Sequence, residues 1–105
     1  MAYWLMVCRH RAGMEELRAR HRDAHREHVA TGGGGVARVL TGGALTLEDG
    51  ETPVGNFGVM DAPDRAAVQA FAEADPFAKA GLVEAIEITP IAARFQAQRI
   101  DPLTR

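Results

Sequence analysis

The pattern of hydrophobic and polar positions predicts four strands and two helices. The run from Tyr3 to Cys8 is apolar at every position, which is typical of a strand covered on both faces. From Met14 to Ala30, apolar residues and histidines recur every three or four positions, which predicts a helix. Further strands are predicted over Val36–Leu45, Gly55–Met60 and Leu82–Ile88, and a second helix lies between the last two.

Glycine, proline and acidic residues mark the ends of these elements. Glycines 32–35 end the first helix, because glycine readily caps a helix and continues into a loose link. We expect Asp61 to cap the second helix, with Pro63 and Asp64 in its first turn, and Pro76 to end it. Its expected apolar face is Ala67, Ala70, Phe71 and Ala74. In the second strand, Gly42 and Gly43 favour a bulge or a close backbone approach.

The resulting order, βαββαβ, predicts an α+β, ferredoxin-like fold in which two helices cover one face of an antiparallel sheet. The other face then needs a partner, and a second copy of the chain is the simplest one, so we expect a sheet-to-sheet homodimer. Residues 1–105 are expected to form a single domain, with a core over about 3–90. The tail over 91–105 can cover a sheet edge or lie across the partner.

Composition narrows the function classes only moderately. With 47% hydrophobic and 25% charged residues and a net charge of −2, the chain has the make-up of an ordinary soluble domain. Residues 9–28 hold six arginines against four acids, an excess that attracts a small anion but is too weak for a nucleic-acid surface. Cys8 is the one cysteine and the apolar start is too short to span a membrane, so we expect a cytoplasmic protein.

Three histidines, at positions 21, 25 and 28, lie within one face of the first helix. Histidines at this spacing can share a metal ion, although no second cluster of metal ligands accompanies them. His21 and His28 occupy the apolar stripe and suit a structural role. His25 lies at the edge of the stripe, beside Arg22, where an imidazole can meet both protein and substrate as a general acid or base.

Asp75 is the second candidate residue. It precedes Pro76 and so can cap the short turn that follows, a purely structural role. The same carboxylate can cap with one oxygen and face an imidazole with the other. The chain has no serine, which excludes a serine nucleophile, and the glycine tract follows a helix rather than a strand, unlike a phosphate-binding loop. No cofactor is expected.

Three segments together resemble the YCII-related (YciI-like) family: Arg22 to His25, Thr41 to Leu45, and Asp75 to Val83. The resemblance covers residues 3 to about 90, and the Asp-Pro-Phe segment is its most specific part. It implies a dimeric α/β barrel of ferredoxin-like subunits. It also implies that His25 and Asp75 match the family's proposed active-site pair. Some members are linked to dehydrochlorination of chlorinated aromatics, and others occur as accessory domains.

Two functions are therefore carried forward. The first is a small enzyme that performs elimination or isomerisation on a small polar or aromatic anion. His25 would transfer the proton, Asp75 would orient it, Arg22 would hold the anionic group, and Gly42 and Gly43 would leave room near the backbone. The second is a non-catalytic module that binds a small metabolite or assists oligomerisation. A metal-dependent enzyme is a weaker third option.

Overall fold

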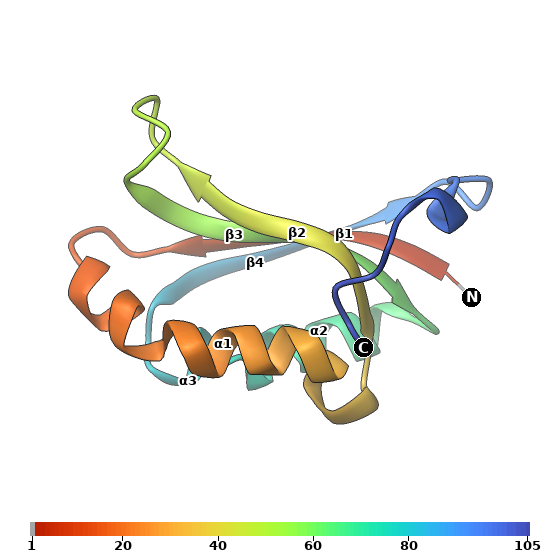
Figure 1. The fold of residues 1–105 in the computed structure, drawn as a ribbon, viewed down its shortest axis with the longest axis horizontal. Coiled ribbons are helices and arrows are strands. Elements are labelled where there is room, and N and C mark those ends of the chain that lie inside the picture. Colours follow the sequence, from red (N-terminus) through yellow and green to blue (C-terminus); the bar gives the residue numbers. More distant parts are fainter. Residues whose placement is uncertain (1) are drawn as a thin grey trace.

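The fold is a four-stranded sheet with its helices packed on one side (Figure 1). The computed structural model describes residues 2–105. Its elements are β1 (Ala2–His10), α1 (Glu15–Gly35), β2 (Arg38–Thr46), β3 (Pro53–Ala62), α2 (Arg65–Ala74), α3 (Pro76–Lys79), β4 (Val83–Ile91) and the 3-10 turn η1 (Ala97–Arg99). This order confirms the predicted α+β βαββαβ fold. No helix among these residues has the length and apolar character needed to cross a membrane.

The sheet has the strand order β2-β3-β1-β4, and each neighbouring pair is antiparallel. Since side chains alternate along a strand, Met6 and Cys8 face the helices while Leu5 and Val7 face the other way. The inward residues join Val39 and Met60 in the core, and the helices contribute Val68, Phe71 and Ala72. This core cluster therefore lies on the helical side of the sheet.

The glycine tract forms a compact turn at the end of α1. Gly32, Gly33, Gly34 and Gly35 all have positive φ, a region that other residues adopt only under strain. The backbone N–H groups of Val36 and Ala37 both donate to the carbonyl oxygen of Gly32, which closes the turn. The predicted helix end is confirmed, but the glycines form a defined left-handed turn rather than a loose link.

Two predictions at α2 are wrong. Asp64, not Asp61, is the N-cap, and its side chain accepts a hydrogen bond from the Ala67 N–H. Asp61 is still part of β3, where it is buried and lies 3.9 Å from an Arg38 nitrogen. The buried face of α2 consists of Val68, Phe71 and Ala72. Ala70 and Ala74 are exposed, because the helix packs through the i, i+3, i+4 stripe of Val68, Phe71 and Ala72, which holds larger apolar side chains than the predicted one.

The bulge in β2 lies before the glycine pair rather than at it. The pairing register with β3 shifts between Val39 and Thr41, so Leu40 is the extra residue of a bulge. The other predicted feature, a close backbone approach, is present at Gly42, where a Cβ atom would collide with the carbonyl oxygen of Phe57.

The C-terminal tail returns to its own subunit and runs beside β2 to the end of α1 (Figure 1). The hydroxyl of Thr104 donates to the carbonyl of Val29 in α1 and accepts from the N–H of Val39 in β2, both at 2.8 Å. The N–H of Leu103 also donates to the Val39 carbonyl at 3.0 Å. Of the two predicted positions, the tail takes the one at a sheet edge, where it ties the helix to β2.

Replacing Thr104 by valine keeps the shape of the side chain but leaves the buried N–H of Val39 without its acceptor. We expect a loss of about 1–3 kcal/mol in the free energy of unfolding, measured by urea denaturation. Thr104→Ser retains the hydroxyl and should stay close to the wild type. Equal stability of the valine and serine variants would contradict this role of the hydroxyl.

Candidate functional site

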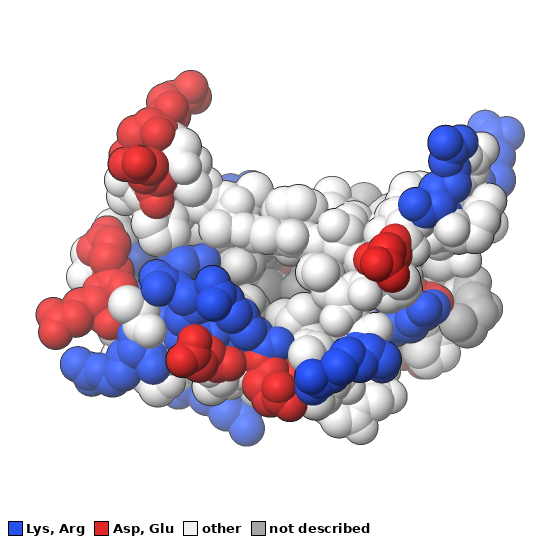
Figure 2. All heavy atoms as spheres, in the orientation of Figure 1, with Lys and Arg blue, Asp and Glu red and all other residues white. Residues whose placement is uncertain are grey.

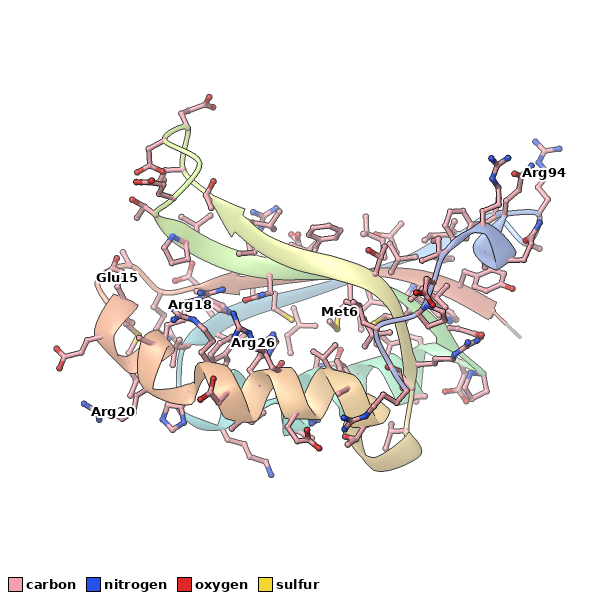
Figure 3. The ribbon with its side chains drawn as sticks, viewed as in Figure 1. Met6, Glu15, Arg18, Arg20, Arg26 and Arg94 are labelled. Atoms are coloured by element: carbon pink, nitrogen blue, oxygen red, sulfur yellow. The ribbon has the colours of Figure 1, made fainter. Side chains whose placement is uncertain are left out.

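A cavity of about 440 Å³ lies between α1 and the inward face of the sheet. Its size is within the range of small-molecule sites. The residues predicted as a site all line it: His25, Asp75, Arg22, Gly42 and Gly43. Figure 2 shows basic side chains over α1 at the rim of a hollow below the sheet, and in Figure 3 Arg18 and Arg26 point from α1 toward the sheet.

His25 and Asp75 form a direct hydrogen bond between α1 and the start of α3. His25 Nδ1 lies 2.8 Å from Asp75 Oδ2 and 3.0 Å from Oδ1. A carboxylate can only accept, so Nδ1 carries the proton and Nε2 is left free to exchange one with a ligand. The His25 ring also stacks on Phe77, with centroids 4.3 Å apart, which holds its plane.

Asp75 performs both of the roles weighed for it. Its Oδ1 accepts from the backbone N–H of Phe77 at 2.9 Å and so caps α3, while both oxygens face His25. The residue is only 7% exposed. The cap holds the carboxylate in the position where it meets His25 and therefore helps to position the imidazole.

The other two helical histidines lie away from this cavity. His28 Nε2 donates to the carbonyl of Phe71 at 2.9 Å and its ring lies against the Phe71 ring, as expected for a structural residue. His21 lies in a shallow groove between α1 and the α2–α3 segment. Among residues 2–105 no three histidine, cysteine or acidic side chains are grouped as metal ligands.

Four polar side chains that line the cavity were missed by the sequence analysis: His10, Arg18, Arg26 and Asn56. Arg18 Nη2 donates to Asn56 Oδ1 at 3.1 Å, which joins α1 to β3. Arg18 precedes Arg22 by one helical turn, and that spacing was a signal that it shares the same face. His10 and Asn56 gave no signal, because their positions follow from strand register.

Burial changes the protonation of two groups in the cavity. It lowers the pKa of His10 to about 4, with the charge of Arg18 as the second cause, so His10 is neutral near pH 7. It raises the pKa of the Cys8 thiol to about 12, with the Asp75 charge adding to the effect. Cys8 is therefore a buried thiol rather than a thiolate nucleophile.

The fold and site thus define a ferredoxin-like α+β protein with a histidine–aspartate pair in a basic cavity. The model of the YCII-related domain matches residues 1–92, and the chain belongs to that family. The resemblance drawn from the three sequence segments is confirmed.

The chain is similar over most of its length to a solved structure of another protein. That protein is the 5-chloro-2-hydroxyhydroquinone dehydrochlorinase TftG from Burkholderia phenoliruptrix, in complex with 2,5-dihydroxybenzoquinone. The two chains share 26% identity with a TM-score of 0.71, over 86% of this chain and 93% of the other. No curated protein is similar enough in sequence to count as a match.

The low pKa of His10 predicts that the protein loses stability in mild acid. The unfolded chain takes up a proton near the ordinary pKa of 6.5, whereas the folded protein resists it until about 4. Stability should thus fall as the pH drops through this window, while it is unaffected by His10 above it. His10 faces Arg18 and His25, which disfavour its protonation, and Asp75, which favours it.

We expect His10→Gln to reduce this acid loss by about 1–2 kcal/mol, a figure discounted for the partial exposure of the ring. The measurement is urea unfolding near pH 7 and near pH 5 for both proteins. An acid loss of the same size in the variant and the wild type would contradict a neutral, buried His10.

Proposed function

We propose that the protein is an enzyme that transfers a proton in an elimination on a small aromatic anion, with His25 as general base and Asp75 as its positioning partner. The observation that carries this proposal is the 2.8 Å bond from His25 Nδ1 to Asp75 in the wall of a ligand-sized cavity. The likeness to a dehydrochlorinase that holds a dihydroxybenzoquinone supports the substrate class.

The chemistry needs few parts. The elimination starts from the keto tautomer of the substrate, in which a hydroxyl proton has moved to the ring carbon that carries chlorine. His25 Nε2 takes the proton of a second hydroxyl, whose oxygen becomes a carbonyl. The ring double bond then shifts to the chlorine-bearing carbon, and chloride departs with the electrons of its own bond. The negative charge of Asp75 stabilises the imidazolium that forms, and the backbone N–H of Phe77 keeps that carboxylate in place. Cys8, as a neutral thiol, takes no part.

The roles of the other predicted residues belong to the same proposal. Arg22 is exposed at the cavity and would attract an anion toward it. Gly42 and Gly43 lie on β2 and would let a flat ligand approach the strand. The backbone of Gly42 lies too close to β3 for any side chain, so this part of the cavity wall is formed by backbone alone.

We further propose that two copies pair through the open face of the sheet. Leu5 and Val7 lie on this face opposite Val59 and Phe57, and Leu5 is 37% exposed. Both helices pack on the other side, so this apolar face has no cover from its own α1 or α2 (Figure 1). With one free cysteine, the cytoplasm is the compartment that we propose.

Removing the proposed base should abolish most of the turnover. With 5-chloro-2-hydroxyhydroquinone as substrate and chloride release as readout, we expect His25→Gln to lower kcat by about 10²–10⁴-fold. His21→Gln is the matched control, because it removes an imidazole from the same helix outside the cavity. A His25→Gln protein with full turnover would overturn the assignment. Wild-type protein that binds this compound without releasing chloride would favour the binding module instead.

Placing a charge on the open sheet face should separate the proposed dimer. We expect Leu5→Glu to convert the protein to monomers in sedimentation equilibrium, because a carboxylate cannot be buried there without a partner. Leu47→Glu changes an exposed leucine in the turn after β2 and should leave the dimer intact. A wild-type protein that sediments as a monomer would refute the pairing.

A further inference from the structure

The cavity carries an excess of positive charge that the protein itself does not neutralise. Arg18, Arg22 and Arg26 line it at four-residue intervals along α1, whereas Asp75 is the one carboxylate among its described lining residues. Arginines at this spacing repel one another and weaken a helix slightly. A charge arrangement that costs stability and faces a ligand-sized space is explained by what binds there.

Arg18 is the most buried of the three arginines, and it has no counter-charge. Its side chain is partly buried, its Nε is shielded from solvent without a hydrogen-bond partner, and its Nη2 reaches only the neutral oxygen of Asn56. The ion pairs formed within residues 2–105 do not include it. Burial lowers the pKa of Arg18, with Arg22 as a further cause, which reflects the same lack of a counter-charge.

Asp75 forms no ion pair with Arg18. Its Oδ1 accepts from the N–H of Phe77, and both of its oxygens are within 3.0 Å of His25 Nδ1. The carboxylate is thus paired with the imidazole and the α3 cap. Among the described lining residues, no other carboxylate is present to pair with Arg18.

Most of the remaining lining residues are apolar. Met6 and Cys8 face it from β1, and Cys8 stays a neutral thiol. Gly42 and Gly58 pair across β2 and β3, which leaves that part of the wall without side chains. A planar hydrocarbon body fits such a surface, and the Arg18 guanidinium, 5.2 Å from the centre of the Phe77 ring, lies on the side of the cavity near His25 and Phe77.

We propose that Arg18, held by Asn56, is the residue that selects the ligand, and that the ligand is a one-ring aromatic compound with a carboxylate or phenolate bound to this guanidinium. The inference rests on the proposed function, because it concerns the same cavity. It adds the anchor that sequence patterns missed: Arg22, exposed at the rim, attracts the anion, and Arg18, deeper in the cavity, binds it.

A pair of probes that differ in charge but hardly in shape tests the proposal. Benzoate and benzamide would be titrated into wild-type protein and three variants by NMR: Arg18→Gln, Arg18→Lys and Arg20→Gln. Arg20 is the matched control, because it lies on the same helix, points away from the cavity in Figure 3 and is 4.0 Å from Glu16.

We expect wild-type protein to bind benzoate more tightly than benzamide. Arg18→Gln should weaken benzoate binding by about 10- to 100-fold, the value of a hydrogen-bonded charge, and leave benzamide binding unchanged. The benzoate affinity of Arg18→Lys should fall between those of the wild type and Arg18→Gln, because lysine keeps the charge without the planar guanidinium. Arg20→Gln should bind both probes like the wild type.

A stability measurement separates binding from a structural role. Because Arg18 is uncompensated in the free protein, Arg18→Gln should unfold at the same or a higher urea concentration than the wild type. A large loss of stability would instead mean that Arg18 holds the fold together. Equal benzoate affinity in the wild type and Arg18→Gln, or equal wild-type affinity for the two probes, would also overturn the proposal.

These binding measurements do not depend on turnover. Protein that binds benzoate through Arg18 but never releases chloride would refute the proposed reaction and leave the ligand class standing. Turnover that depends on His25 but is unchanged in Arg18→Gln would support the proposed reaction and refute the role of Arg18 in ligand selection.

Discussion

The site depends on the carboxylate of Asp75, which makes two kinds of contact at once. It caps α3 through the N–H of Phe77 and holds the imidazole of His25 across the interface between α1 and α3. Because the group is buried, each contact satisfies an atom that water no longer reaches. The Phe77 ring completes the arrangement by stacking on His25. Asp75 and Phe77, at the start of α3, thus supply the acid, its backbone donor and the aromatic support for the imidazole.

Much of this arrangement could be predicted, because it depends on residues that are close to one another in the sequence. Proline after Asp75 ends one helix and starts the next, so the acid is placed at a turn whatever the tertiary fold. The imidazole of His25 stands at the polar edge of an amphipathic helix, where a residue faces the seam between that helix and its neighbour. That the two side chains meet followed from the family resemblance, and the structure brings them within 2.8 Å.

Other parts depend on register and helix start, which local patterns do not determine. By residue type, Asp61 and Asp64 are equally suitable helix caps. Because β3 extends through Asp61 to Ala62, the helix begins later and Asp64 is its cap. Asn56 joins the site only because it pairs with Cys8 across two strands and lies within reach of Arg18. The tail packs on its own β2 through a threonine hydroxyl whose partners are 65 and 75 residues away. No periodicity within the tail carries that information.

The bond that orients the imidazole also accounts for the charge of the cavity. The Asp75 carboxylate is bonded to His25 and a backbone N–H and forms no ion pair with Arg18, so the guanidinium is available to a ligand. In a partly dehydrated site, the field of the guanidinium is stronger than it would be in water. It acts on the ground state of an anionic ligand and also on the negative charge that grows as a proton leaves for His25. Binding and proton transfer therefore draw on a single electrostatic arrangement.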